Sequence, residues 1–412
     1  MGFSLKSEYA KNIFTLMSGT AIAQVLPILT TPILTRYYGP IEFGMLGMFI
    51  GIVSLLVVIS TFKYDVAIIQ PKDDSIAEQL FNLSFCLSSL FSVLILILIN
   101  FNIEYLKTLN DHENFKYFLY LIPFTVFILS ANSSLTFIIN RRKNYKQMSM
   151  NKVIQGTGIT LVSLTFGLLD FTSFGLLIGF LTGHTTVFFN LMYKYWNTIA
   201  KIDFTSFYSI AYKYKSYPMF ALPSGLSNTA ATQMPVILLA KVFNSSISGY
   251  YYLVERVLSA PITFLGSSVS SVFRQKAQED KHVLGNYNKI FKKTFINLVF
   301  IGLPIFIIIG IFGQQIFMLV FGDEWVSTGL YAQILAPLFL LKFCISPLMS
   351  SLYISNKLNV DVIGQIVYAV LIISSIYIGY VFDDIILSIS LISFFGSIFY
   401  LFFLYLTYNY SK

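Results

Sequence analysis

Four basic side chains fall within or at the ends of long apolar segments, where an isolated charge is costly. Arg256 and Lys342 lie inside such segments, and Arg36 and Lys241 lie at the ends of two others. A charge placed in this way usually faces a water-filled cavity or a partner. Arginine holds phosphate through paired hydrogen bonds, and lysine holds it as a point charge. The four residues therefore indicate a cationic cavity that binds an anionic, phosphate-bearing substrate.

Two acidic side chains accompany these cations. Glu255 directly precedes Arg256, and Asp65 lies at the end of another apolar segment. Both are candidates for pairing with a cation or for ion coupling, with an H⁺ or Na⁺ gradient as the energy source. Successive helix residues point about 100° apart, so Glu255 and Arg256 need not pair with each other. For Arg36 and Lys241, the alternative is that the side chains snorkel to the membrane interface.

Prolines mark two of the apolar segments. Pro27 and Pro32 lie in the first segment, and Pro223 and Pro235 lie in the seventh. A proline inside a helix removes one backbone hydrogen bond and permits bending. We therefore expect these four residues to allow the bending and gating motions that alternating access requires.

Residue types that serve enzymes and metalloproteins are sparse in this chain. The two cysteines, Cys86 and Cys344, lie in apolar runs, and the three histidines are scattered over the sequence. The sequence contains no glycine-rich phosphate loop and no nucleophile motif with partner residues. We therefore expect no catalytic residue, no metal site and no cofactor, and we interpret His184 as a packing residue.

The composition is typical of a polytopic membrane protein. Of the 412 residues, 56% are hydrophobic and 11% are charged, and the mean hydropathy is +0.73. A soluble domain is about 45–50% apolar and about 25% charged, so an ordinary soluble domain, a disordered chain and a disulfide scaffold are all excluded. The net charge of +8 fits cations in cytoplasmic loops better than it fits a nucleic-acid partner.

The apolar residues form twelve segments that match, or nearly match, the length of a membrane span. A spanning helix needs about 20 mostly apolar residues. The predicted segments are 12–35, 41–62, 79–101, 117–139, 153–169, 174–193, 217–241, 249–273, 295–319, 329–353, 360–381 and 386–409. The first is interpreted as a retained helix rather than a cleaved signal peptide, because a signal h-region has only about 7–15 apolar residues.

Lysine and arginine residues set the predicted topology. The N-terminus and the even-numbered loops hold 21 of the 27 basic residues, and the opposite side holds 4. Basic residues concentrate on the cytoplasmic side of a membrane protein. Both termini are therefore predicted to be cytoplasmic. The adjacent residues Arg141, Arg142 and Lys143 are interpreted mainly as a topology determinant.

The chain is predicted to be duplicated, with one six-helix lobe over residues 1–205 and a second over residues 206–412. A shift of 205 residues aligns Gly44 with Gly249. Because six spans is an even number, both halves have the same orientation and form a parallel repeat, with a pseudo-two-fold axis along the membrane normal. We expect the substrate cavity between the two lobes.

Several motifs resemble those of bacterial polysaccharide exporters. They are Tyr38-Gly39-Pro40 with Phe43-Gly44, Tyr64-Asp65-x-Ala67-Ile68 and Pro71-Lys72, together with NRRKNYKQMS from Asn140 to Ser149 and SGYYYLVERVLSAP from Ser248 to Pro261. With the span count and the duplication, they make the chain resemble the O-antigen flippase (Wzx-type) family. That family is part of the multidrug/oligosaccharidyl-lipid/polysaccharide (MOP) flippase superfamily.

This resemblance implies a fold, a substrate and a location. The fold would be MATE-like, an all-α integral membrane protein with about twelve transmembrane helices in two lobes. The substrate would be undecaprenyl diphosphate bearing one repeat unit of O-antigen or another surface polysaccharide, which the protein would carry from the cytoplasmic to the outer face of the bacterial inner membrane. Partners would be membrane lipids and, in the same pathway, a polymerase and a chain-length regulator.

The resemblance also bears on individual residues. Arg256 lies where the family pattern expects a cation. The middle of the second span, 45–60, carries no charge, whereas related flippases of a peptidoglycan precursor carry an arginine there. Lys342 is a candidate to compensate for this difference.

Two other functions stay open from the sequence. A drug or cation antiporter of the same superfamily would need acidic residues facing the cavity, and Glu255 is the only acidic residue placed well inside a span. A membrane O-antigen polymerase or ligase would need a large outer loop with catalytic Arg or His. The longest predicted outer loop, 102–116, holds only His112 and two lysines.

Overall fold

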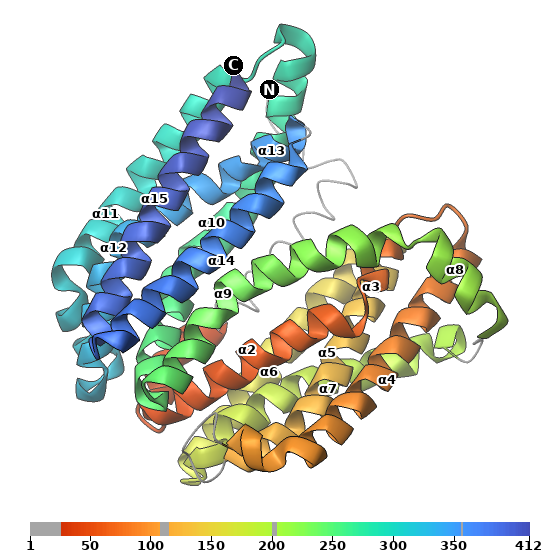
Figure 1. The fold of residues 1–412 in the computed structure, drawn as a ribbon, viewed down its shortest axis with the longest axis horizontal. Helices are drawn as coiled ribbons and strands as arrows, with labels where there is room; N and C mark the ends of the chain where they lie inside the picture. Colours follow the sequence, from red (N-terminus) through yellow and green to blue (C-terminus); the bar gives the residue numbers. More distant parts are fainter. Residues whose placement is uncertain (1–25, 108–114, 200–203, 356) are drawn as a thin grey trace. The chain divides into compact units, whose positions relative to one another are not determined.

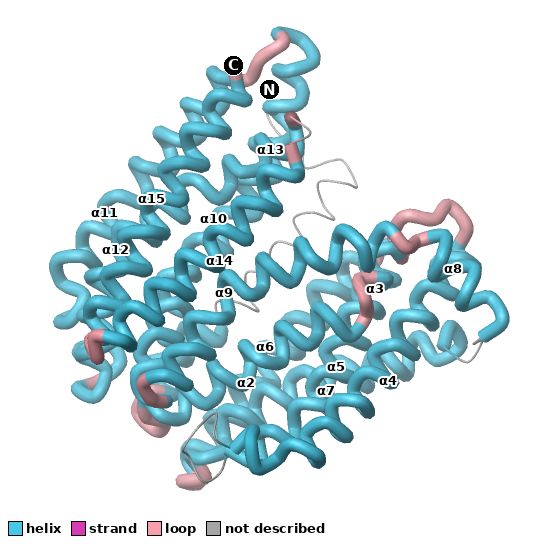
Figure 2. The backbone as a smooth tube through the Cα atoms, in the orientation of Figure 1, coloured by secondary structure: helices cyan, strands magenta, loops and turns pink. Residues whose placement is uncertain are grey.

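The structure is a computed structural model that describes residues 26–107, 115–199, 204–355 and 357–412. Within these residues every regular element is a helix and none is a strand (Figure 2). A bilayer offers no hydrogen-bond partner to the backbone, and a helix satisfies its N–H and C=O groups internally. The predicted all-α membrane fold is confirmed.

The described residues fall into two compact units. Of the described residues, those from 26 to Tyr38 and from Met48 to Thr229 form unit 1, and those from Gly39 to Gly47 and from Ala230 to Lys412 form unit 2. Helix α2 (Pro40–Ser60) contributes its first turns to unit 2 and the rest to unit 1. The predicted lobe boundary between residues 205 and 206 stays a prediction.

Unit 1 is built mainly from long helices joined by short turns (Figure 1). After α2 come α3 (Tyr64–Ala67), α4 (Asp74–Lys107), α5 (Phe115–Arg141), α6 (Tyr145–Leu168), α7 (Thr172–Ile199), a 3₁₀ turn (Phe204–Ser206), α8 (Phe207–Lys213), a π-helical turn (Tyr217–Ala221) and α9 (Leu222–Val242), whose second part belongs to unit 2. The described part of the first predicted segment, residues 26–34, is also helical.

Unit 2 continues the same pattern to the end of the chain. Its elements are α10 (Ser245–Leu284), α11 (Asn288–Phe321), a 3₁₀ turn (Asp323–Trp325), α12 (Val326–Ile345), a 3₁₀ turn (Ser346–Met349), α13 (Ser350–Ile354), α14 (Leu358–Val381) and α15 (Ile385–Ser411). Two of these helices, α10 and α15, begin at a side-chain cap. The Oδ1 atoms of Asn244 and Asp384 accept hydrogen bonds from the backbone N–H groups of Ile247 and Leu387, which satisfies donors that a helix start leaves open.

Eight helical stretches in the described residues are long and apolar enough to cross a membrane. They are α2, α4, α5, α7, α11, Asp323–Ile354 around α12, α14 and α15. Helices α6, α9 and α10 coincide with three further predicted segments but carry more polar residues. The first predicted segment lies only partly within the described residues. The count of twelve spans therefore stays a prediction.

Two stretches between predicted spans, 194–216 and 274–294, belong to the even-numbered loops on the predicted cytoplasmic side, and their described residues are largely helical. The predicted loop 274–294 lies mostly on the continuation of α10, which ends only at Leu284, and on the start of α11 at Asn288. The loop predicted over 194–216 contains α8. Helix α6 likewise begins at Tyr145, well before the predicted start at residue 153. Polar residues lengthen these helices beyond the apolar runs, because helix formation does not require an apolar sequence once the helix has been nucleated.

Close packing of α6 against α7 depends on small residues. A Cβ added at Gly183 would lie 2.6 Å from the Gln155 carbonyl oxygen, and one added at Gly158 would lie 3.2 Å from the Gly183 Cα. Glycine at such contacts lets two membrane helices approach backbone to backbone. Tyr38 also packs against α6, because its phenol donates a 2.7 Å hydrogen bond to the carbonyl oxygen of Ser163.

In unit 2 the first turns of α2 cross the start of α10 at a pair of glycines. A Cβ on Gly44 would lie 1.8 Å from the carbonyl oxygen of Ser245, and a Cβ on Gly249 would lie 1.8 Å from that of Pro40. The 205-residue shift pairs Pro40 with Ser245 and Gly44 with Gly249, so the contact is reciprocal between the aligned positions. The buried rings of Phe43 and Trp325 meet edge to face beside it, with centroids 5.1 Å apart.

We predict that Gly44→Ala and Gly249→Ala each lower the thermal stability of the purified protein by several degrees. A methyl group at either position meets main-chain atoms that cannot yield, and overpacking of this kind costs about 1–3 kcal/mol or more. Gly310→Ala is the matched control, because its added Cβ meets only the Ala336 Cβ at 3.7 Å. Equal melting temperatures for all three variants would show that the glycine contact is not tight.

Candidate functional site

The charged residues of α10 and α12 meet within unit 2. Glu255 and Arg256 lie on α10 and Lys342 lies on α12, which packs against α10. The Glu255 carboxylate lies close enough to the Lys342 ammonium to attract it electrostatically. We call these three half-buried residues the unit 2 triad. It holds two positive charges and one negative charge.

Aromatic side chains surround the unit 2 triad. The Arg256 guanidinium donates a hydrogen bond to the phenol oxygen of Tyr252. Tyr251 and Tyr368 are only 6% and 9% exposed. Their phenol groups lie close enough to Glu255 to interact with its carboxylate electrostatically. The Lys342 Nζ lies 5.2 Å from the centroid of the Phe339 ring. Such walls keep water away from the charges, so an anion that reached them would interact more strongly than in solvent.

The other two predicted cations lie at exposed ends of helices. Lys241 is exposed in the last turn of α9. Arg36 is exposed in the turn that follows residues 26–34, and it belongs to unit 1. The structure thus brings Glu255 of α10 near Lys342 of α12, with Arg256 next to Glu255 on α10, and it places Lys241 and Arg36 at exposed helix ends. Their roles in substrate binding stay a prediction.

Asp65 is held by hydroxyl groups of unit 1. Its side chain is buried, and its two carboxylate oxygens accept hydrogen bonds from the hydroxyls of Thr61, at 3.0 Å, and Ser133, at 2.8 Å. Phe62 and Lys63 just before it adopt positive φ angles of 49° and 62°. Asp65 therefore ties the sharp α2–α3 turn to α5. Within the described residues no group of three His, Cys, Asp or Glu could hold a metal ion.

The predicted bending residues all lie in helical segments, and one of them follows an irregular turn. The Thr31 and Thr35 hydroxyls donate to the carbonyl oxygens of Pro27 and Pro32, at 2.6 and 3.1 Å. Pro235 lies inside α9. Pro223 lies in the first turn of α9, directly after the π-helical turn Tyr217–Ala221, and its carbonyl oxygen accepts from Ser227. Hydroxyl groups commonly bind carbonyl oxygens of this kind, and whether these helices bend stays a prediction.

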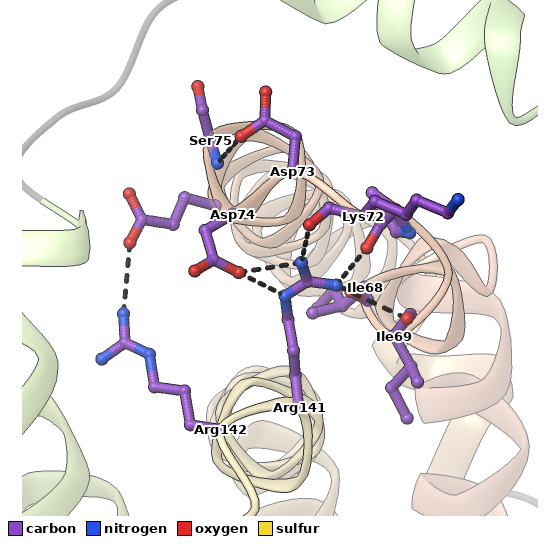
Figure 3. Close-up of polar contacts among 10 residues, drawn as sticks. Ile68, Ile69, Lys72, Asp73, Asp74, Ser75, Arg141 and Arg142 are labelled. Carbon is purple, nitrogen blue, oxygen red and sulfur yellow. Dashed lines mark hydrogen bonds and ion pairs between the residues drawn. The ribbon is translucent and has the colours of Figure 1, made fainter.

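Arg141 has a structural role that its sequence context does not reveal. At the end of α5 its guanidinium donates to Asp74, at 2.8 Å, and to carbonyl oxygens of the α3–α4 turn (Figure 3). The carbonyl groups belong to Ile68, Ile69, Pro71 and Lys72. Its side chain is 13% exposed, whereas that of Asp74 is 86% exposed. One side chain thus fixes the whole α3–α4 turn. We call Arg141 with these contacts the Arg141 clamp.

A second feature missed from the sequence is a polar stripe on α6. Gln147, Asn151 and Gln155 recur every four residues and so share one face of the helix. Gln147 and Asn151 are buried, at 9% and 6% exposure. The four-residue spacing is the signal that could have identified this stripe.

Comparison with known proteins identifies one family. The sequence profile of the family described as "Polysaccharide biosynthesis protein" matches residues 33–329. Among curated protein sequences, none matches this chain.

Solved structures of MOP superfamily transporters have the same fold. The lipid II flippase MurJ, in an inward closed conformation, superimposes with a TM-score of 0.77 at 14% identity, over 95% of this chain and 86% of that one. An inward-facing multidrug resistance MATE family transporter gives 0.72 at 15% identity, over 93% of each chain. A MOP superfamily transporter from Pyrococcus furiosus gives 0.67 at 15% identity, over 98% of this chain and 96% of that one.

We predict that Lys342→Met alone destabilises the protein more than Lys342→Met combined with Glu255→Gln. The single change leaves a carboxylate without its partner in a low-dielectric site, and the second change removes that charge. A double-mutant cycle of thermal stability should give a coupling of about 0.5–3 kcal/mol. Additive effects would mean that the two side chains do not interact.

We predict that Arg141→Lys lowers stability because an ammonium group cannot reach Asp74 and several carbonyl oxygens at once. Hydrogen bonds to charged groups contribute about 1.5–3 kcal/mol each, so a loss of several degrees in melting temperature is expected. The matched control is Arg142→Lys, since Arg142 makes one exposed ion pair, with Glu78 at 3.1 Å. If both variants melt at the same temperature, the clamp contributes nothing.

Proposed function

This chain belongs to the polysaccharide biosynthesis protein family of the MOP superfamily, and on that premise we propose that it flips a lipid-linked oligosaccharide across the membrane. The cargo is undecaprenyl diphosphate bearing one repeat unit of O-antigen or another surface polysaccharide. The unit 2 triad is the observation that carries the proposal, because it offers two cations to a diphosphate on the packed helices α10 and α12.

The diphosphate binds to the triad by taking the place of the Glu255 carboxylate beside Lys342. In the resting state the Glu255 carboxylate attracts Lys342 electrostatically. A diphosphate carries more charge than a carboxylate and offers several acceptor oxygens, so it displaces Glu255 from the lysine. Arg256, which already donates to Tyr252, adds the planar fork that suits phosphate oxygens. The sugars and the lipid tail need no charge for their passage.

The charge balance favours an anionic cargo over a cationic drug. The unit 2 triad keeps one net positive charge after Glu255 has paired with Lys342, and a lipophilic cation would be repelled there. A drug antiporter of the same superfamily is therefore the weaker candidate. No step of the proposed process makes or breaks a covalent bond, so the protein acts as a transporter and not as an enzyme.

The rest of the proposal concerns place and pathway. The protein lies in the bacterial inner membrane with both termini in the cytoplasm, and the cargo moves from the cytoplasmic to the outer leaflet. A polymerase and a chain-length regulator use the product. An H⁺ or Na⁺ gradient supplies the energy, and Glu255 is the candidate coupling residue because cargo binding frees its carboxylate.

We predict that Arg256→Ala and Lys342→Ala each reduce surface polysaccharide at least about tenfold at equal protein level, because each removes a charge-assisted contact to phosphate. Arg256→Lys should retain partial export, since it keeps the charge and loses the fork. Surface polysaccharide is measured by immunoblot of a deletion strain that carries each variant. Lipid-linked repeat units should accumulate in the cell as export falls.

Lys289→Ala is the matched control, because Lys289 is an exposed basic residue in the first turn of α11, outside the triad. It should export like the parent protein. Full export by both Arg256→Ala and Lys342→Ala would remove the triad from the mechanism. Resistance to cationic dyes that depends on the triad would favour the drug antiporter instead.

A further inference from the structure

The polar stripe of α6 continues as a chain of hydrogen bonds into the interior of unit 1. The exposed Lys194 of α7 donates from Nζ to Gln147 Oε1 at 2.7 Å. Gln147 in turn donates from Nε2 to Asn151 Oδ1 at 2.7 Å, and Asn190 donates to the same oxygen at 3.4 Å. From Gln147 to Gln155 the stripe extends over about 12 Å of helix at about 1.5 Å per residue.

A cavity of about 280 Å³ lies along this stripe, between α5, α6 and α7. Its polar lining comes from all three helices: Asn132, Ser133 and Thr136 on α5, Asn151, Lys152 and Gln155 on α6, and His184 on α7. A single water molecule needs only about 10–15 Å³. The cavity is therefore large enough for a small organic molecule and too polar to stay dry.

The far wall of the cavity is held in place by His184 and Asn132. Gln155 Nε2 and His184 Nε2 lie 3.0 Å apart, so the amide donates and the imidazole accepts. Asn132 Nδ2 donates to the His184 carbonyl oxygen, also at 3.0 Å. The other amide atom, Asn132 Oδ1, is buried and has no hydrogen-bond partner within the described part of the chain. A buried acceptor of this kind is costly unless a ligand or water donates to it.

The lining selects the chemical class of ligand. Among the described residues no acidic side chain lines the cavity, so nothing there neutralises a cation. One lysine among neutral amides and hydroxyls does not match the charge of a phosphate. Amide and hydroxyl groups suit a ligand that both donates and accepts many hydrogen bonds. Apolar side chains, including Phe137 and Met148, complete the wall and suit C–H groups.

We propose that this cavity binds one monosaccharide ring. A sugar ring carries both hydroxyl groups and C–H groups, which matches a lining that combines amides and hydroxyls with apolar side chains. Asn132 Oδ1 accepts from one ring hydroxyl, and the lysine and amide groups of α6 donate to others. The inference deepens the proposed function and rests on it for the source of the sugar, which is the repeat unit of the cargo.

Sugar binding is measured directly by saturation-transfer-difference NMR on the full chain in lipid nanodiscs. The probes are D-glucose, D-galactose and N-acetyl-D-glucosamine, and the competitors are glycerol, inorganic phosphate and tetraethylammonium. The variants are Asn132→Leu, which removes the unpartnered acceptor, and Met148→Phe, which fills the cavity without removing a hydrogen bond. Asn100→Leu is the matched control, because Asn100 is exposed on α4 and donates to its own helix at Leu96.

The proposal predicts that at least one sugar binds the parent protein and the control equally. The apparent Kd should rise about tenfold in Asn132→Leu, as expected for one lost hydrogen bond to a buried group, and Met148→Phe should abolish the signal. Melting temperature and size-exclusion profile establish whether each variant is folded. If one of the two cavity variants is not folded, the binding measured for the other variant tests the proposal. The proposal is overturned if all variants bind the sugars equally. It is also overturned if only phosphate or tetraethylammonium binds.

This result and the export assay of the triad variants can fail separately. Without sugar binding, but with triad-dependent export, the cavity inference falls and the flippase proposal stands. If sugar binding depends on the cavity but export does not depend on the triad, the cavity inference stands and the proposed role of the triad in flipping falls.

Discussion

A polar group inside a bilayer must find its partner within the protein, and this constraint organises the whole structure. Lipid offers no hydrogen bonds, and an isolated charge there costs several kcal/mol. Among the long described helices, α6, α9 and α10 are the least apolar. Groups on neighbouring helices interact with the polar side chains that these helices carry: Lys342 attracts Glu255 electrostatically, and His184 accepts a hydrogen bond from Gln155. The polar interior is thus also where a polar cargo can be received.

The two units meet this constraint with different chemistry. Unit 2 pairs opposite charges on α10 and α12 and keeps a surplus cation. Unit 1 instead buries neutral amides and hydroxyls, and the buried carboxylate of Asp65 is satisfied by two hydroxyl groups. A lipid-linked oligosaccharide has the same two chemistries, a diphosphate and a set of sugars. Our two proposals assign each chemistry to the unit that matches it.

The long apolar helices could be predicted from the sequence because hydropathy and backbone hydrogen bonding act along the chain. The predicted segments 41–62 and 386–409, for example, nearly coincide with α2 and α15. The start of α6 could not be predicted in this way, because its polar residues face the interior and interrupt the apolar run. Glu255 and Arg256 were singled out as charges in a span, but the lysine that pairs with Glu255 is distant in sequence and only the fold brings it close. The Arg141 clamp was missed because carbonyl oxygens, which every residue has, are most of its partners.

The most direct test of the central claim follows the cargo itself. Purified protein is reconstituted into liposomes together with undecaprenyl-diphosphate-linked repeat units from the producing cell, and a glycosidase is added outside. In protein-free liposomes only the outer-leaflet sugars, about half, should be cleaved. The account predicts that the protein exposes the remaining half over time and that Arg256→Ala slows this exposure. The account would be contradicted if, in active proteoliposomes of the parent chain, the inner-leaflet sugars stayed as protected from the glycosidase as they are in protein-free liposomes.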